Sequence, residues 1–195
     1  MTGFSVHTGK VAVLEADHVD TDRIIPARFL SMVTRSGYGE LLFSDVRGGD
    51  FILDRPEAQG ASVLVVGTNF GCGSSREHAV WAIQQAGFVA VVARKESDSP
   101  GFSDIFRQNA ANCGLLLIEL LPEAHSRIVR LGTGAEVTVD LLNQQIAGES
   151  FEILPATKEQ LVRGLDLIGT TMDLEDSITS FEGKHDPIAP VGTSV

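Results

Sequence analysis

Residues 69–79 read Asn-Phe-Gly-Cys-Gly-Ser-Ser-Arg-Glu-His-Ala and bring two hydroxyl groups and a guanidinium into one short segment. An apolar run typical of a buried strand precedes them, and residues 79–86 read as a helix. A glycine-rich turn therefore delivers Ser74, Ser75 and Arg76 to the start of a helix. Backbone N–H groups are unpaired there and the helix dipole is positive, so the position favours an anion. The pattern indicates a site for a carboxylate or an oxyanion, with a planar guanidinium beside it.

A purely structural interpretation of the same segment also stands. Ser74 and Glu77 have the spacing of an S-x-x-E capping box, and Gly71 and Gly73 would then only permit a tight turn. The glycine spacing fits neither a P-loop nor the G-x-G-x-x-G motif. From these residues alone, helix capping and anion binding both stay open.

The composition is that of an acidic α/β domain. The chain has 195 residues, a formal net charge of −11 and a pI of about 4.8, which argues against nucleic acid as a partner. No apolar run approaches the length of a membrane span, and no signal peptide is visible, so we expect a cytoplasmic protein with no membrane partner. We expect one domain over residues 1–182 and a loose tail over residues 183–195.

Strands and helices alternate along much of the chain. The β pattern is continuous and apolar in the first four segments and alternating in the fifth, and one hairpin partner follows. The expected strands are 10–14, 63–66, 88–93, 115–118 and 136–140, with 145–154 as the hairpin partner. The expected helices are 26–32, 79–86, a segment capped by Ser103 or Asp104 that runs to about residue 112, 123–131, and one opening at Thr157 with Gly164 inside it. The unit 62–93 predicts a parallel crossover with a ligand site at the carboxyl end of its first strand.

Four segments in a fixed order carry a family resemblance. Residues 69–79 resemble the signature of the small, swivelling domain of the aconitase superfamily. Residues 19–30, residues 102–106 with 114–116, and residues 161–169 followed by Phe181-Glu182 match its other motifs. More narrowly, the chain resembles the isopropylmalate dehydratase small-subunit family from about residue 7 to residue 182. The resemblance implies a β/β/α swivelling domain, as in the aconitase C-terminal domain.

The resemblance also implies a reaction and a partner. Members of the family move a hydroxyl group between adjacent carbons of a small malate-type dicarboxylate substrate by dehydration and rehydration. The chemistry needs a [4Fe-4S] cluster, which a separate large subunit supplies, so this chain is expected to bind no cofactor and no metal. Its two cysteines, Cys72 and Cys113, are too few for such a cluster and are expected to be free thiols.

By the same resemblance, Ser74 is the base that takes the carbon-bound proton, and Arg76 stabilises the alkoxide and binds a carboxylate. Ser75 is a hydrogen bonder to the substrate or a helix cap, and Gly73 is a further substrate-binding candidate. Asp22, in the Asp-Thr-Asp of the N-terminal motif, orients the catalytic arginine or serine.

Structural alternatives stand beside three of these assignments. Asp20 and Asp22 would otherwise cap the helix that starts at Pro26. His78 could pair with Ser75 as a base on one helix face, but we expect it to be structural. Cys72 is a conceivable nucleophile at a helix start, but nothing near it in the sequence reads as its base.

Arg35 is the candidate for substrate recognition, in a loop that in relatives touches the part of the substrate that differs among malates. A solvated loop arginine is the competing interpretation. A branched alkyl group would need apolar neighbours, and Leu30, Val33 and Tyr38 are available. Thr68 departs from the family pattern, which has an acidic residue there.

Two alternative functions stay open. Close paralogues with similar signatures act on citraconate, dimethylmalate or homoaconitate. A non-catalytic binding or regulatory module is the second alternative.

Overall fold

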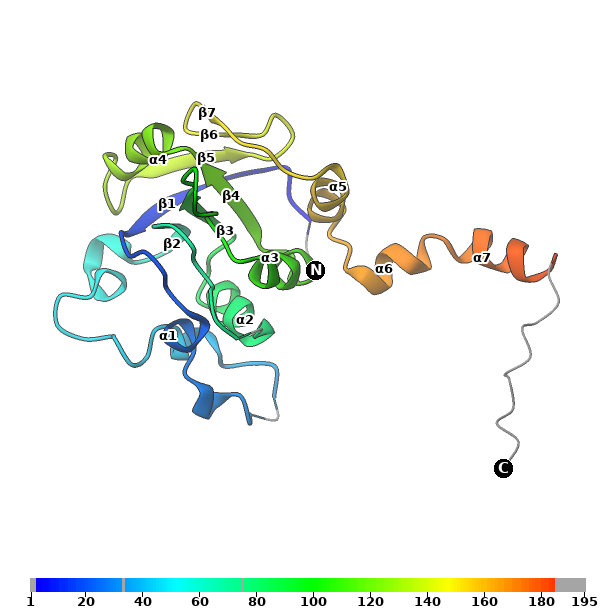
Figure 1. Cartoon of the computed structure of the whole chain (residues 1–195), viewed down its shortest axis with the longest axis horizontal. Coiled ribbons are helices and arrows are strands. Elements are labelled where there is room, and N and C mark those ends of the chain that lie inside the picture. The colour runs from blue at the N-terminus through cyan, green and yellow to red at the C-terminus, as the bar shows by residue number, and fades with distance from the viewer. Residues whose placement is uncertain (1–2, 33, 75, 185–195) are drawn as a thin grey trace.

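The computed structural model describes residues 3–32, 34–74 and 76–184. Its centre is a mixed sheet of seven strands in the order β4-β3-β2-β1-β5-β6-β7 (Figure 1). The four strands from β4 to β1 run parallel, and the remaining neighbours pair antiparallel. The strands are β1 (Val6–Leu14), β2 (Ala61–Val66), β3 (Ala90–Arg94), β4 (Leu116–Leu120), β5 (Glu136–Asp140), β6 (Gln145–Ile146) and β7 (Glu149–Ser150).

Helices pack on both faces of this sheet, and an arm of two helices follows. The helices are α1 (Thr21–Ile24), α2 (Glu77–Gln85), α3 (Asp104–Cys113), α4 (Pro122–Val129), α5 (Pro155–Arg163), α6 (Leu167–Met172) and α7 (Glu175–Glu182). Short 3-10 turns cover Ala27–Phe29, Gly39–Leu41, Ile52–Asp54 and Pro56–Ala58. None of the helices in the described ranges has both the length and the apolar composition that crossing a membrane requires.

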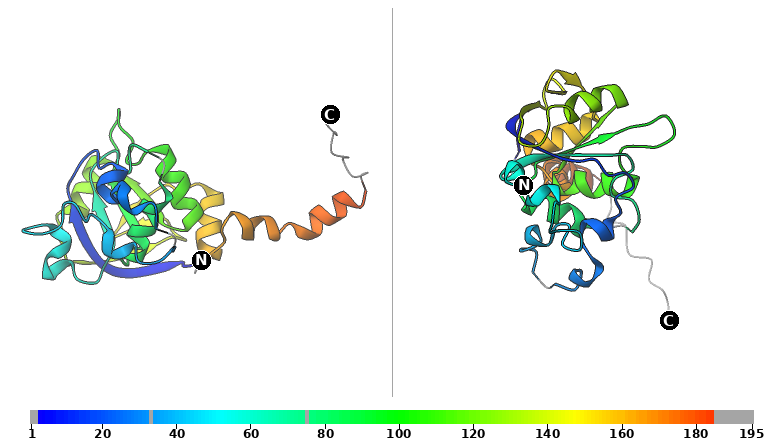
Figure 2. Two further views of the ribbon diagram at one scale, coloured as in Figure 1. Left: turned by 90° about the horizontal axis from the view of Figure 1, so that it is seen from below. Right: turned by 90° about the vertical axis from the view of Figure 1, so that its left-hand side faces the viewer.

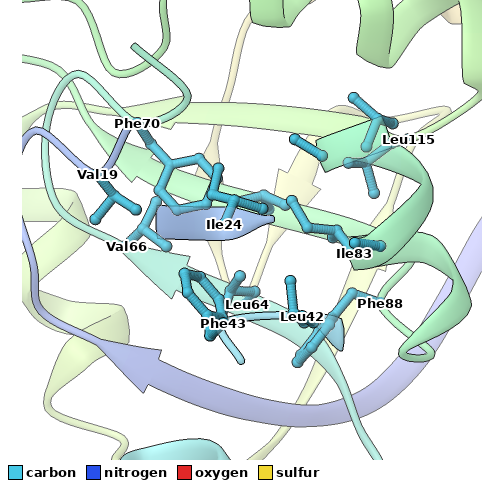
Figure 3. Close-up of a cluster of buried hydrophobic side chains, with 14 of the residues drawn as sticks. Val19, Ile24, Leu42, Phe43, Leu64, Val66, Phe70, Ile83, Phe88 and Leu115 are labelled. Atoms are coloured by element: carbon cyan, nitrogen blue, oxygen red, sulfur yellow. The ribbon is translucent and has the colours of Figure 1, made fainter. Parts of the chain in front are cut away.

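The central strand β2 divides its side chains between two hydrophobic clusters. Leu64 and Val66 belong to the cluster that α2 and α3 cover, where Ile83 of α2 also packs (Figure 3). Val63 and Val65 belong to the cluster on the other face, which α4 and α5 cover. Because successive side chains of a strand point to opposite faces, a strand buried on both sides must be apolar throughout. This burial explains the unbroken apolar run before the glycine-rich turn.

Most of the expected elements are present with shifted ends. Strands β1 to β5 and helices α2 to α5 each lie on a segment that the sequence predicts, and Ser103 caps α3 by accepting from the backbone N–H of Phe106. The parallel pairing of β2 with β3 confirms the predicted crossover. The expected helix at 26–32 is only a 3-10 turn, with Pro26 at its N-cap.

The predicted hairpin partner of β5 is present but shorter than expected: β6 pairs antiparallel with β5 over Gln145–Ile146 only, and the short strand β7 follows. Two other details of the C-terminal third were predicted wrongly. The helix opens at Pro155 with Leu154 as its N-cap, so Thr157 lies inside the helix and does not cap it. Gly164 ends this helix with a φ of 68°, because glycine adopts the left-handed conformation that a helix C-terminus commonly needs.

Helices α6 and α7 extend from α5 as an arm that leaves the sheet (Figures 1 and 2). An ion pair between Arg163 of α5 and Asp173 ties the base of this arm to α5. Large apolar side chains along the arm are exposed, among them Met172, Leu174 and Ile178. A single domain over residues 1–182 stays a prediction, and the predicted tail falls beyond residue 184, outside the described residues, except for its first two positions.

Candidate active site

Two chain segments leave the same edge of the sheet side by side, one after β1 and the other after β2. The backbone N–H of Gly71 donates to the carbonyl of Val19 (2.8 Å), and the N–H of Thr21 donates to the carbonyl of Cys72 (2.9 Å). The two parallel strands thus continue as two paired loops beyond the regular sheet. As a result, the Asp-Thr-Asp motif lies directly beside the glycine-rich turn.

A third loop, after β3, holds the turn from its other side. Ser103 Oγ donates to the carbonyl of Gly71 (2.6 Å) while it also accepts from Phe106 N–H (3.3 Å). The backbone N–H of Phe70 donates to the carbonyl of Gly101 (2.8 Å). The N-cap of α3 therefore also fixes the glycine-rich turn. The sequence predicted only the capping role of Ser103.

The two glycines of the turn are required for different reasons. Gly71 has a φ of 73°, and a Cβ placed on it would lie 2.3 Å from Cγ of Phe106. Gly73 has a φ of 93°, but a Cβ on it would meet nothing closer than Cβ of Asp20 at 3.6 Å. Close packing excludes a side chain at Gly71, whereas only backbone conformation disfavours one at Gly73.

Ser74 is exposed at the end of this turn, and its backbone is anchored. The Thr21 hydroxyl donates to the Ser74 carbonyl (2.9 Å), and Thr21 is 1% exposed. Thr21 was missed as a functional residue. Its place between the two aspartates of the Asp-Thr-Asp motif was the only signal in the sequence. Ser75, predicted to contact substrate, lies outside the described residues.

The capping-box interpretation of Ser74 is wrong. Helix α2 begins at Glu77 with Arg76 as its N-cap residue, and the Arg76 side chain makes no capping hydrogen bond. Glu77 is therefore the first helical residue rather than the third. Ser74 precedes the helix by three residues, so its hydroxyl is free of a capping role. For the same reason it lies further from the helix dipole than the sequence indicated.

Arg76 and Asp22 meet across the two loops. Arg76 Nη1 donates to Oδ1 of Asp22. The Arg76 side chain is 13% exposed and that of Asp22 is 56% exposed, so the cation is held largely inside the loops by a carboxylate at the surface. Asp20 does cap a helix, but the helix is α1: its Oδ1 accepts from the N–H of Arg23 (2.7 Å). The two aspartates of the motif thus have separate roles.

The predicted recognition residue Arg35 lies over α2. Its Cζ is 5.1 Å from the centroid of the Trp81 ring. Leu30 is half-buried, and Val33 lies outside the described residues. Tyr38, one of the apolar neighbours available to an alkyl group, is fully buried. The Tyr38 ring packs on the helix because burial of an aromatic side chain anchors the loop there.

His78 packs among aromatic rings. Its ring centroid lies 5.4 Å from that of Tyr38 and 4.7 Å from that of Trp81. These contacts agree with the structural interpretation of His78.

Both thiols have raised pKa values. Burial, and then the charge of Asp20, raise the pKa of Cys72. Burial, and then a contact of 3.3 Å with a carboxylate oxygen of Glu77, raise the pKa of Cys113 to about 12. Both groups therefore stay protonated at neutral pH, and a protonated thiol is a poor nucleophile.

The described residues do not fit an iron–sulfur cluster. Within them, no group of three or more His, Cys, Asp or Glu side chains converges in the way that a metal ion needs. The two cysteines are the only ones in the sequence, and such clusters usually take three or four ligands.

Side-chain hydrogen bonds hold the carboxyl ends of β2 and β3 next to the glycine-rich turn. Asp17 accepts from the backbone N–H of Thr68 (2.8 Å) and from Nη2 of Arg94 (2.9 and 3.0 Å), and these bonds lower its pKa against the opposing effect of burial. His125 lies 1% exposed with Nε2 2.7 Å from the carbonyl of Val66, and burial lowers its pKa. These contacts fix the strand end from which the glycine-rich turn departs.

This chain combines a β/β/α domain with a serine–arginine turn at the carboxyl end of a central strand, and this combination indicates its protein family. The chain belongs to the aconitase C-terminal domain family, whose model matches residues 1–123. Its similar relatives are more specific. It is 44% identical to the 3-isopropylmalate dehydratase small subunit of Roseiflexus castenholzii over 202 residues, which cover 96% of each chain. It is 43% identical to the small subunit of the same name from Bacillus subtilis, over 92% of this chain and 94% of that one.

A solved structure agrees with these relatives. The crystal structure of 3-isopropylmalate dehydratase from Methanocaldococcus jannaschii aligns with a TM-score of 0.66 and 28% identity. The alignment covers 91% of this chain and 99% of that chain. The predicted fold class and family are therefore confirmed.

Proposed function

We propose that the chain is the small subunit of a 3-isopropylmalate dehydratase, a cytoplasmic hydro-lyase of leucine biosynthesis. The enzyme interconverts 2-isopropylmalate and 3-isopropylmalate through isopropylmaleate, by loss and return of water. The similar proteins with this printed name support the proposal because they match nearly the whole chain. The observation that carries it is an exposed Ser74, free of any capping role, two residues from an arginine held in place by Asp22.

The proposal divides the chemistry between two subunits. Dehydration of a malate-type diacid needs a base for a carbon-bound proton, a Lewis acid for the departing hydroxyl and cations for the carboxylates. A large subunit carrying a [4Fe-4S] cluster would supply the Lewis acid, as the family resemblance implies. This chain supplies the base and a carboxylate-binding cation.

Ser74 takes the proton from the substrate carbon in this proposal. A serine hydroxyl is a weak base, so its alkoxide must be stabilised in the closed site. Arg76 carries a permanent charge two residues away, and exclusion of water by the partner subunit would strengthen its effect. The Thr21 bond to the Ser74 carbonyl holds the backbone that carries this basic oxygen. Removal of a single positioned base typically slows turnover about 10²- to 10⁴-fold.

Arg76 binds a substrate carboxylate and the alkoxide, and Asp22 fixes the direction of its guanidinium. A planar fork that can make two parallel bonds suits a carboxylate better than an ammonium does. Gly73 and Ser75 contact the substrate through the turn, and Arg35 recognises the part that differs among malates. We therefore expect a large loss of activity in the variant Arg76→Lys.

Reconstitution with a cluster-bearing large subunit tests the proposal. The purified chain alone should not hydrate isopropylmaleate, and the mixture should, with lower activity toward citraconate and dimethylmaleate. Hydration of isopropylmaleate by the isolated chain would contradict the two-subunit proposal. A complex that prefers citraconate or dimethylmaleate would identify a paralogous hydro-lyase, and a complex that binds structured RNA without turnover would identify a regulatory module.

A further inference from the structure

The side chain of Gln85, in the last turn of α2, bonds to the backbone at two positions, Arg35 and Tyr38, of the loop that follows the 3-10 turn Ala27–Phe29 (the Arg35 loop). Its Nε2 donates to the carbonyl of Arg35 (2.8 Å), and its Oε1 accepts from the backbone N–H of Tyr38 (2.9 Å). One amide thus satisfies a backbone acceptor and a backbone donor three residues apart. Both bonds lie within the range of well-formed hydrogen bonds.

The same loop packs closely on the helix around this amide. A Cβ placed on Gly39 would lie 2.4 Å from the backbone oxygen of Gln85, so the chain passes the helix end at a distance that only glycine allows. Tyr38 is fully buried, with its ring 5.7 Å from that of Trp81. The Arg35 guanidinium faces the same Trp81 ring.

Helix α2 therefore connects the two arginines of the proposed site. Arg76 is its N-cap residue, and Trp81 and Gln85 follow one turn apart on the side that meets the loop. A helix is a rigid spacer of about 1.5 Å per residue. This helix and the Gln85 amide set the distance between two guanidinium groups. Arg76 is proposed to bind a carboxylate, and Arg35 is proposed to sense the variable group of the substrate.

We propose that Gln85 is a positioning residue for substrate choice: it fixes the Arg35 loop on α2 and so sets which alkyl group the site accepts. The inference rests on the proposed function for its substrates. Gln85 need not touch the substrate. Its removal should weaken recognition of the group that the loop senses while the proton transfer at Ser74 continues.

The matched control is the neighbouring residue. Gln84 uses its Nε2 to donate to the carbonyl of Cys113 at the end of α3 (2.8 Å) and not to the loop. Gln84→Met and Gln85→Met each remove an amide from the same helix at the same side-chain length. Only the second removes the contact with the loop.

The kinetic test uses the reconstituted complex with isopropylmaleate and citraconate, which differ only in the alkyl group. For Gln85→Met we expect the ratio of kcat/KM for isopropylmaleate to that for citraconate to fall about tenfold, through KM, with kcat within about twofold. Gln84→Met should leave the ratio unchanged. An unchanged ratio in Gln85→Met, or an equal change in Gln84→Met, would overturn the inference.

A second measurement needs no activity. Trp81 is the single tryptophan of the chain. Because the Arg35 loop covers its ring, release of the loop in Gln85→Met should raise acrylamide quenching of Trp81 fluorescence about twofold in the free subunit, and Gln84→Met should not. Gln85→Glu keeps the acceptor for Tyr38 N–H but loses the donor to Arg35, and it serves as the second variant should the methionine variant fold poorly.

The two readouts separate the possible failures. Unchanged quenching in both Gln85 variants would overturn the positioning role. In another outcome, the quenching changes in the Gln85 variants while the reconstituted wild-type complex turns over neither diacid. That result would overturn the proposed function and its substrate choice, but not the contact between Gln85 and the loop.

Discussion

Arg76 and Asp22, which lie 54 residues apart in the sequence, form an ion pair that joins the loop after β2 to the loop after β1. Most of the Arg76 side chain is buried, and its partner carboxylate lies at the surface. An arginine with one fixed carboxylate partner keeps its orientation, and its remaining N–H groups can meet a second carboxylate. The pair therefore links two of the four segments that carry the family resemblance.

Asp22→Asn should damage catalysis much more than stability. The amide keeps the size of the carboxylate but loses the charge that directs Arg76, so we expect kcat/KM in the reconstituted complex to fall about 10- to 100-fold, as when a residue that orients a functional group is lost. A half-exposed ion pair contributes at most about 1 kcal/mol, so urea unfolding should change little.

The control for Asp22→Asn is Glu149→Gln. This substitution breaks the ion pair between Arg127 of α4 and Glu149 of β7, which lies away from the glycine-rich turn. Its activity should equal that of the wild type. Equal kcat/KM values for the two variants would show that the Arg76–Asp22 pair has no catalytic role.

Thr21→Val tests the anchor of the serine. Valine matches threonine in shape but leaves the Ser74 carbonyl without its buried donor, which should lower the free energy of unfolding by about 1–3 kcal/mol and slow turnover. Thr21→Ser retains the hydroxyl and should keep most of both properties. Urea titration and kcat measurements on the two variants would contradict this role if they gave the same values.

The two glycines of the turn should respond differently to alanine. Gly71→Ala adds a methyl group against Phe106 in a positive-φ conformation and should destabilise the chain by more than about 3 kcal/mol, since overpacking and backbone strain add. Gly73→Ala meets only the strain, about 1–2 kcal/mol. A smaller loss for Gly71→Ala than for Gly73→Ala in chemical unfolding would be evidence against the packing of Phe106 under the turn.

The sequence predicted the elements well where burial alone determines them. The apolar run of β2 could be interpreted directly, because a strand covered on both faces has no polar side. Ser103 was found as a helix cap, since its bond to Phe106 is local in the sequence. The motifs also identified the family, and with it the pairing of the N-terminal motif with the glycine-rich turn.

The sequence could not predict contacts that depend on where the loops meet. The Thr21–Ser74 and Ser103–Gly71 bonds join residues that are distant in the sequence, and no pattern in either segment encodes them. The S-x-x-E spacing at Ser74 was misleading for the same reason. Backbone bonds to neighbouring loops hold the turn and delay the helix until Glu77, whatever its local capping preference.

Stability should fall in mild acid because of His125. Burial lowers its pKa in the folded chain below the ordinary value of 6.5, whereas the unfolded chain titrates near that value. The unfolded state therefore binds the proton first, and the free energy of unfolding should decrease as pH falls below about 6.5, by up to about 1.4 kcal/mol per pH unit.

Chemical unfolding of wild type and His125→Gln between pH 7.5 and about pH 5 measures this effect. The variant should be less stable at pH 7.5, and its stability should depend less on pH across this range. Asp17, whose pKa is lowered from 3.8, titrates below the range and does not contribute. Parallel curves for the two proteins would exclude His125 as the titrating group.

Turnover by Ser74→Ala in complex with the large subunit tests the central claim most directly. The side chain is exposed and caps no helix, so the variant should fold, bind the large subunit and bind substrate with a KM close to that of the wild type. We predict that kcat for isopropylmaleate falls by about 10³-fold, as expected for loss of the base. A kcat within a few-fold of the wild-type value would contradict the assignment of proton abstraction to this serine.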